Sequence, residues 1–163
     1  MSKQNEELEH RLKLRNLKHS DFNDIKEIML STYKTEAMSW TQEEFNNQLN
    51  AFPEGQICLE DNGKVVAMAL SIIVDYAKYG DNHSYEQIIG YGKFDTHDEM
   101  GDTLYGTDIF VDKEYRGLRL GRRLYDARKE LCENLNLRSI IAGGRIPGYS
   151  KFADQMSPRR YIE

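Results

Sequence analysis

The chain has 163 residues and a mass of 19.0 kDa, which is the size of a single domain with one hydrophobic core. Hydrophobic residues make up 39%, charged residues 30% and aromatic residues 10% of the sequence, a composition that excludes a disordered chain. The net charge of −5 argues against a protein that binds nucleic acid or an anionic membrane with its whole surface, although a local basic patch is compatible with it.

The sequence carries no mark of export or of membrane insertion. Its start is charged and has no apolar run, unlike a signal peptide. The longest apolar run, Val65–Val74, falls far short of the ~20 residues that a membrane span needs. Cys58 and Cys132 lie within apolar patterns, which predicts buried thiols in a reducing compartment. We therefore expect a soluble, cytoplasmic protein.

The N-terminal part of the chain predicts a strand followed by a helix. Residues 1–10 form a polar tail, and residues 11–163 are expected to form one domain. Arg11–Asn16 alternates leucines with charged residues, which is typical of a short strand. Ser20 is the expected N-cap of a helix whose apolar positions recur at helical spacing to about Tyr33.

A second short helix and a hairpin follow. Thr41 and Glu44 have the spacing of a capping box, which marks the start of the helix. Gln56–Glu60 is an apolar run, Asp61–Gly63 has turn chemistry, and Lys64–Val74 is a long run of strand-forming residues.

Residues 75–102 are the least regular part of the chain. Within them, residues 81–102 contain six acidic side chains and one lysine, a net charge of −5. This stretch is either a solvated acidic excursion or the carrier of a short helix around Tyr85–Ile89.

The C-terminal part predicts a strand, a helix and a further strand. Thr103–Val111 has a strand pattern, and the leucines from Leu120 to Leu135 mark one face of a helix. Arg138–Ala142 is a short strand, which Gly143 and Gly144 are expected to close. The sequence therefore predicts an α/β (α+β) fold with the order β-α-α-β-β-β-α-β, a mixed central sheet flanked by helices, and a parallel last strand pair.

The last residues suggest that the chain continues. Ser157 and Pro158 have the chemistry of an N-cap and a first helical turn, but the sequence stops at Glu163, after little more than one turn. We interpret the chain as the front part of a longer protein; the alternative is a frayed natural terminus.

The segment with the clearest functional pattern runs from Thr107 to Tyr125. A strand leads into a loop with Gly117, and Gly121 stands where the next helix begins. Unpaired amides and the helix dipole make such a helix start an anion site, and glycine allows close approach. Tyr115–Lys129 holds six basic residues and one acidic residue, a net charge of +5 that points to an anionic ligand.

Other interpretations of this segment stay open. It can be an ordinary turn followed by an amphipathic helix with a solvated basic face. It is not a P-loop, because no Gly-Lys-Ser/Thr follows, and its glycine spacing is not that of a dinucleotide site. A nucleic-acid contact is disfavoured, because the only aromatic residues among its basic ones are Tyr115 and Tyr125.

At these residues the chain resembles the GNAT superfamily of acyl-CoA-dependent N-acyltransferases. The family motif is a strand ending in Val, a short loop, and Arg/Gln-x-x-Gly-x-Gly/Ala opening a helix; Val111–Gly121 has the sequence VDKEYRGLRLG. The element order also matches the first five strands and three helices of the family, without its last strands. The resemblance implies acetyl-CoA or coenzyme A (CoA) as co-substrate. It places CoA on Ile109, Phe110, Val111, Arg116, Gly117, Leu118, Arg119, Leu120, Gly121 and Arg122.

The chain departs from the family pattern in two places. Arg119 stands at the central glycine of the motif. If its backbone is helical, its N–H can still hold a phosphate; if the position needs close approach, Arg119 weakens binding. The usual Asn-x-x-Ala-x-x-x-Tyr segment is also missing after Gly144.

A closer resemblance is to the amino-terminal GNAT-like domain of bacterial proteins that continue into a carbon–nitrogen hydrolase (nitrilase-like) domain. It is carried by Leu104–Asp108, Arg116–Lys129, Gly143–Tyr149 and Met156–Pro158. The resemblance implies a covalently adjoining hydrolase domain as a partner.

Two residues are candidates for acid–base chemistry. Asp108 is the one carboxylate in the uncharged run Thr103–Val111 and is a candidate base for the amine; alternatively it is a strand-edge carboxylate that caps a helix or pairs with an arginine. Tyr149 is a candidate acid for the leaving thiolate; alternatively it is a loop tyrosine packed on the sheet.

Two histidines, one tryptophan and one methionine are weaker candidates for a site. His83 and His97 lack metal-ligand spacing, so no metal site is expected. Trp40 and Met38 line an acceptor pocket or form part of the core.

Two functional hypotheses follow. The first is an enzyme that transfers acetyl from acetyl-CoA to an amine of a small molecule or peptide. The second is a CoA-binding or regulatory docking module for the hydrolase domain, without turnover. Neither nucleic acid nor membrane is an expected partner, and a homodimer stays open.

Overall fold

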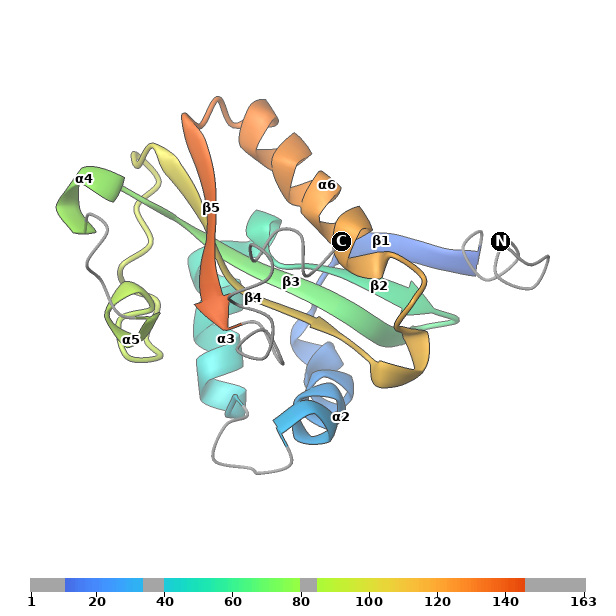
Figure 1. Ribbon diagram of the computed structural model, residues 1–163. Coiled ribbons are helices and arrows are strands. Elements are labelled where there is room, and N and C mark those ends of the chain that lie inside the picture. Colours follow the sequence, from blue (N-terminus) through green and yellow to red (C-terminus); the bar gives the residue numbers. More distant parts are fainter. Residues whose placement is uncertain (1–10, 34–39, 80–84, 146–163) are drawn as a thin grey trace, which may run out of the picture.

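The computed structural model describes residues 11–33, 40–79 and 85–145, which form one sheet with helices on both faces (Figure 1). The sheet has five strands in the order β1-β2-β3-β4-β5. The first three neighbouring pairs are antiparallel, and β4 and β5 are parallel. The strands are β1 (Leu12–Asn16), β2 (Ile57–Asp61), β3 (Lys64–Val74), β4 (Thr103–Val111) and β5 (Ser139–Arg145).

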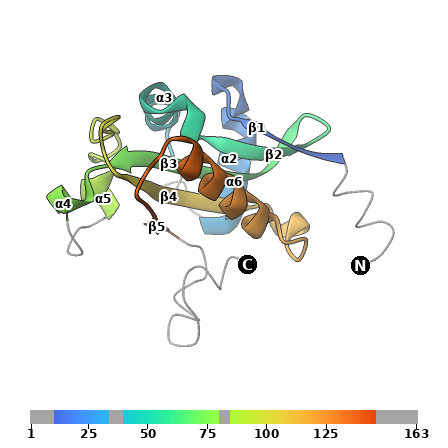
Figure 2. The same cartoon turned by 90° about the horizontal axis from the view of Figure 1, so that it is seen from above.

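Helices α2 and α3 cover one face of the sheet and α6 covers the other, as Figures 1 and 2 both show. The α-helices are α2 (Phe22–Tyr33), α3 (Gln42–Ala51), α4 (Tyr76–Tyr79), α5 (Tyr85–Ile88) and α6 (Leu120–Asn134). Three 3-10 turns are η1 (His19–Asp21), η3 (Pro53–Gly55) and η4 (Lys113–Tyr115). The predicted fold class, element order and parallel last pair are confirmed.

The strands bury both of their faces, which explains the long apolar run in β3. Met68 and Phe110 belong to the cluster under α2 and α3, whereas Ala69 and Ile109 belong to the cluster under α6. These four residues are cross-strand partners in two successive pairs, so the two clusters follow the alternation of side chains along the strands.

Two helix starts show which capping predictions succeed. The capping box is confirmed: Thr41 Oγ1 accepts from the Glu44 N–H at 3.1 Å, and Glu44 Oε1 accepts from the Thr41 N–H at 3.1 Å. The prediction that Ser20 caps the first helix is wrong. Ser20 lies inside η1, and the Asp21 carboxylate accepts from the Lys18 N–H at 2.7 Å, because a 3-10 turn precedes the helix.

The acidic stretch is more ordered than a solvated excursion. A short helix, α5, is present as the second alternative predicted, and α4 was not foreseen. Ile88 and Phe94 are buried in the core. The Asp98 and Asp102 amides donate to the carbonyls of Ile73 and Val74, which fastens this stretch to the end of β3.

Strand β5 runs further than predicted. Gly143 and Gly144 do not close it, because it continues to Arg145, which stands opposite Asp108 in the register with β4. Pairing with a parallel neighbour supplies backbone hydrogen bonds that compensate for the low strand preference of glycine.

Cys58 and Cys132 are buried free thiols, as predicted. Burial raises the pKa of Cys58 to about 12. Within the three described ranges, no helix has the length and apolar character needed to cross a bilayer.

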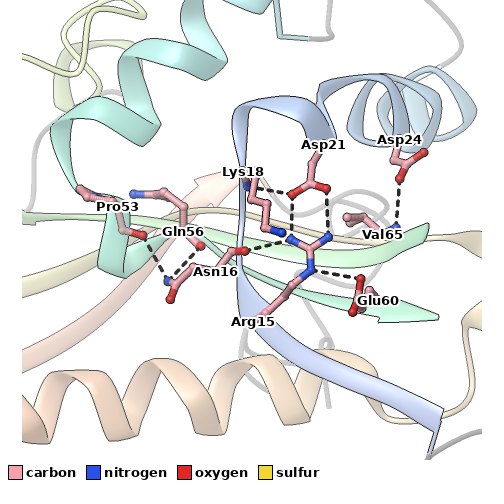
Figure 3. Close-up of polar contacts among 9 residues, drawn as sticks. All are labelled: Arg15, Asn16, Lys18, Asp21, Asp24, Pro53, Gln56, Glu60 and Val65. Atoms are coloured by element: carbon pink, nitrogen blue, oxygen red, sulfur yellow. Dashed lines mark hydrogen bonds and ion pairs between the residues drawn. The ribbon is translucent and has the colours of Figure 1, made fainter. Parts of the chain in front are cut away.

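At the N-terminal corner, charged side chains tie β1 to η1 and β2 (Figure 3). Arg15 donates to both oxygens of Asp21, at 2.9 and 3.0 Å, and its Nε lies 3.1 Å from Glu60 Oε2. Burial by itself would raise the pKa of Asp21, but the hydrogen bonds from Arg15 and Lys18 outweigh it and lower that pKa. Arg15 therefore stabilises the packing of β1 against η1 and β2.

Candidate functional site

The loop between β4 and α6 starts from a fixed backbone position. The Asp112 N–H donates to the Val66 carbonyl at 2.8 Å, and Asp112 Oδ1 accepts from the Glu114 N–H at 3.0 Å. The Tyr115 N–H then donates to the Asp112 carbonyl at 2.8 Å, which closes η4. This turn sets the direction in which the chain approaches α6.

A side-chain contact ties the loop to the β2–β3 hairpin. The Tyr115 hydroxyl donates to Asp61 Oδ2 at 2.5 Å, and Arg11 Nη2 donates to the same oxygen at 2.9 Å. Hydrogen bonds from Arg11 and then Tyr115 lower the pKa of Asp61, and the bond to Asp61 raises the pKa of Tyr115 to about 12. Both groups therefore keep this contact over the neutral pH range.

The loop ends in two left-handed residues. Gly117 has φ +88°, and Arg119, the N-cap of α6, has φ 58° and ψ 33°. The alternative in which the Arg119 backbone is helical is wrong. A left-handed conformation costs an L-residue roughly 1–2 kcal/mol, which gives a physical reason for glycine at this position of the family motif.

The first turn of α6 presents amide groups. The Arg123 N–H donates to the Arg119 carbonyl at 3.2 Å and begins the helical hydrogen bonds. In the described part of the chain, no side chain caps the amides that precede it, those of Leu120, Gly121 and Arg122. This end of the helix can therefore accept an anion.

Three arginines lie around these amides. Arg116, Arg119 and Arg122 are exposed, and among the described residues no carboxylate lies within ion-pair distance of them. The loop thus combines amide donors with positive charge, which is what a diphosphate needs.

The other basic residues of Tyr115–Lys129 do not surround the amides at the start of α6. Arg123 Nη2 donates to the Leu12 carbonyl at 3.3 Å, and Arg128 is buried against the sheet. Lys129 is exposed, but it lies about two helical turns beyond Arg122. The net charge of the segment therefore overstates the charge available to a ligand.

The other predicted CoA-contacting residues offer backbone groups. The side chains of Ile109, Phe110 and Leu120 are in the core, while Val111 and Leu118 pack against the cluster under α6. The β4–β5 register runs from Thr103 to Asp108, and Ile109–Val111 extend past it. This last part of β4 leads directly into the loop.

Asp108 lies at an irregularity of β4. Leu70 pairs with Asp108 and Ser71 pairs with Gly106, so Thr107 is an extra residue on β4. Asp108 is 2% exposed, and its pairing with Leu70 puts it on the α2–α3 face. It is not a strand-edge carboxylate, because β4 is an interior strand. Its role as a base stays a prediction.

A buried polar network at the bulge was not foreseen from the sequence. Gln48 Nε2 from α3 donates to Thr107 Oγ1 at 3.1 Å and to Gln56 Oε1 at 3.2 Å. The Ser71 N–H donates to Gln56 Oε1 at 3.0 Å. A polar residue within an otherwise apolar strand was the available signal, since such a residue needs a partner when it is buried.

The remaining candidates have structural environments or lie outside the description. Burial lowers the pKa of His97, whose Nδ1 accepts from the Ile73 N–H at 3.0 Å. Trp40 is 4% exposed and packs on Phe94 with ring centroids 5.3 Å apart, which favours its interpretation as core. Within residues 11–33, 40–79 and 85–145, no three metal-ligating side chains come together. Tyr149, Met38, His83 and Met156–Pro158 lie outside the described residues.

Comparison with known proteins places the chain in a family. The sequence model of the acetyltransferase (GNAT) family matches residues 22–147. The probable hydrolase YhcX of Bacillus subtilis (strain 168) is 36% identical over 155 residues, which are 95% of this chain and 30% of YhcX. The uncharacterized N-acetyltransferase YkwB of the same organism is 32% identical over 124 residues, 76% of this chain and 55% of YkwB. The chain thus spans about a third to about half of these relatives.

Solved structures agree in fold. The loading GNATL domain of CurA from Lyngbya majuscula has a TM-score of 0.71 at 22% identity, over 90% of this chain and 70% of that one. The GphF GNAT-like decarboxylase in complex with isobutyryl-CoA has a TM-score of 0.65 at 17% identity, over 91% of this chain and 74% of that one. From the family match and the two relatives, the chain belongs to the GNAT family of acetyltransferases.

Proposed function

We propose that this domain transfers an acetyl group from acetyl-CoA to the amine of a small molecule or peptide. The observation that carries the proposal is the start of α6 in a GNAT chain, where amides that no described side chain caps lie among exposed arginines. The bound isobutyryl-CoA of GphF supports a CoA thioester as co-substrate.

In this proposal the CoA diphosphate binds the amides of Leu120, Gly121 and Arg122, with Arg116 and Arg119 as charged contacts. The backbone of Ile109–Val111, at the end of β4, contacts the pantetheine arm. The thioester then lies near the β4 bulge that carries Asp108.

The chemistry is a direct transfer. The ammonium of the acceptor loses a proton to Asp108, and the free amine attacks the thioester carbonyl carbon. A C–N bond forms and the C–S bond breaks, so the product is an amide and CoA leaves as a thiolate. Tyr149 is the proposed acid that protonates this thiolate, and it is restored by the second proton that the nitrogen loses as the amide forms.

Calorimetry and a thiol-release assay test the proposal. We expect the chain to bind CoA and acetyl-CoA and to release free thiol with at least one member of an amine panel. Asp108→Asn should retain CoA binding and lose thiol release. Absence of binding at ~1 mM ligand, equivalent to a free energy weaker than about −4 kcal/mol, would end this proposal.

A second candidate function rests on the match to YhcX, of which this chain covers only 30%. In that case the domain binds CoA and docks on or regulates an adjoining carbon–nitrogen hydrolase domain without turnover. CoA binding with no thiol release across the panel supports this candidate, whereas robust acetyl transfer by the domain counts against it.

A further inference from the structure

Arg128 is a buried arginine without a carboxylate contact in the described residues. It lies in α6 and is 2% exposed. Its Nη2 donates to the carbonyls of Leu70 and Asp108, at 2.5 Å each. Its Nε, which is also buried, has no hydrogen-bond partner within the part of the chain that the structure describes.

The carbonyls of Leu70 and Asp108 lie where the pairing of β4 shifts in register with both of its neighbours, β3 and β5. The β3–β4 pairing shifts after Leu70, and the β4–β5 pairing shifts between Gly106 and Asp108. One guanidinium nitrogen therefore joins both strands at the bulge, and a neutral side chain of similar length cannot replace its donors.

Gly106 makes room for this contact. A Cβ at Gly106 would lie 2.6 Å from Arg128 Nη1 and 2.9 Å from its Cζ, closer than side-chain atoms approach one another. The glycine in the middle of β4 thus allows the guanidinium to lie directly against the strand.

The charge of Arg128 acts on Asp108 across the strand. Burial lowers the pKa of Arg128 to about 10, and the Asp108 carboxylate opposes that shift. The side chain thus stays protonated at neutral pH. Since electrostatic coupling is mutual, the same positive charge favours the ionised form of Asp108.

We propose that Arg128 is a positioning residue: its contacts with the Leu70 and Asp108 carbonyls hold the β4 bulge that presents Asp108, and its buried positive charge favours the form of this carboxylate that can accept a proton. The inference rests on the proposed function only in giving Asp108 the role of base.

Tyr105 is a titratable neighbour of Asp108 among the described residues. Tyr105, on the same strand, has a pKa raised to about 12 by burial, with a smaller contribution from Asp108, and is neutral. Leu70 on β3 and Gln48 on α3 do not titrate in the neutral range. Arg145 on β5 stands opposite Asp108 in the register, so its removal is a necessary comparison.

The test is a pH titration of the Asp108 carboxyl group. The readout is its 13C NMR signal in protein labelled at the aspartate carboxyl carbons, and Asp108→Asn identifies that signal. Arg128→Met should raise the titration midpoint by about one pH unit, because an opposite charge nearby lowers an aspartate pKa by ~1–3 units. Arg128→Lys, which keeps the charge, should restore most of that shift. Lys129→Met is the matched control and should move it by less than about 0.2 units, because Lys129 is an exposed neighbour on the same helix.

Two further variants keep the proposal falsifiable. If Arg128→Met does not fold, Gly106→Ala displaces the guanidinium by contact and should raise the midpoint partway. Arg145→Gln shows whether β5 supplies the charge instead. An unchanged midpoint in Arg128→Met or, if that variant does not fold, in Gly106→Ala would overturn the proposal. A midpoint that shifts only in Arg145→Gln would also overturn it. So would a shift in Arg128→Lys as large as that in Arg128→Met.

Kinetics separate this inference from the proposed function. With an acceptor found in the amine panel, Arg128→Met should lower kcat about 10-fold or more, move the acidic limb of the pH–rate profile to higher pH and leave the KM for acetyl-CoA within about twofold. An unchanged limb would contradict the role of Arg128. Full activity of Asp108→Asn would instead end the proposed role of Asp108 as base, while the carboxyl titration would still test Arg128.

Discussion

The N-terminal corner and the start of α6 both gather arginines, but in opposite surroundings. At the corner, Arg15 is held by Asp21 and Glu60 at 2.9–3.1 Å (Figure 3). At the start of α6, Arg116 and Arg122 are exposed, and no described carboxylate lies within ion-pair distance of them.

The difference separates stability from binding. An arginine whose charge is already matched by carboxylates stabilises the fold and has little to offer a ligand. Exposed arginines that no described carboxylate pairs, beside amides that no described side chain caps, can contact an anion. Changes at the corner should therefore alter the free energy of unfolding and leave CoA affinity alone, whereas changes at the loop should do the reverse.

The largest expected effect is on CoA affinity. Gly121→Glu adds a negative charge where the diphosphate is proposed to bind. Repulsion at ~4 Å with an effective dielectric near 20 is about 4 kcal/mol, or roughly a thousandfold in Kd. Calorimetry with CoA measures this loss, and circular dichroism checks the fold.

Gly121→Gln is the matched control for this variant, since Gly121 is buried and any side chain adds volume there. Glutamine has the size of glutamate without its charge, so it should lose much less affinity. Equal losses for the two variants would mean that volume, not a bound anion, explains the effect.

Arg116→Ala should weaken CoA binding by about 1–3 kcal/mol. It removes one charge-assisted contact and leaves the loop amides in place. The melting temperature should stay close to that of the wild type, because Arg116 is exposed. A variant that binds CoA as the wild type does would remove Arg116 from the site.

Arg15→Met should lower the free energy of unfolding by about 1–2 kcal/mol. It removes the hydrogen bonds to Asp21 and the ion pair to Glu60, and partial exposure of Arg15 moderates the loss. Urea unfolding measures the change. CoA affinity should not move; if it did, the corner and the loop would not be separate.

The stabilisation from Asp21 should depend on pH in a defined direction. Its folded pKa lies below the ordinary aspartate value of 3.8, so its contribution to stability is present above that value and is lost as pH falls through the folded pKa. The difference in melting temperature between wild type and Arg15→Met should therefore shrink from about pH 5 to about pH 2. A constant difference would show that charge pairing is not the cause.

The smallest effect is expected for Arg119→Gly. Glycine relieves the left-handed conformation at φ 58°, which favours the folded state by up to about 1 kcal/mol, although glycine also gains freedom in the unfolded chain. CoA affinity should fall by less than for Arg116→Ala if the amides dominate. A loss larger than that of Arg116→Ala would make the Arg119 guanidinium a principal contact.

The sequence predicted most of the elements and the position of the loop between β4 and α6 well, because both depend on local patterns. Periodicity located α6, and the run Val111–Gly121 matched a family motif. The errors were local as well: η1 displaced the expected cap at Ser20, and β5 passed through two glycines because β4 supplied its pairing.

The bulge could not be predicted, because it depends on partners distant in sequence. Thr107 is fixed by Gln48, 59 positions away, and the Asp108 carbonyl is held by Arg128, 20 positions away. From the sequence alone, Arg128 was counted with the other basic residues of Tyr115–Lys129 as a possible contact of an anionic ligand. Only packing separates it from Arg116, since both belong to the same basic run.

The most direct test of the account is an amide map of CoA binding. In 15N-labelled protein, CoA should produce its largest chemical-shift changes at the amides of Gly117, Leu120, Gly121 and Arg122, and it should leave the amides of Lys18 and Asp21 unchanged. Saturating CoA that moves none of the four loop amides, or that moves the N-terminal corner instead, would contradict the claim that the start of α6 holds the diphosphate.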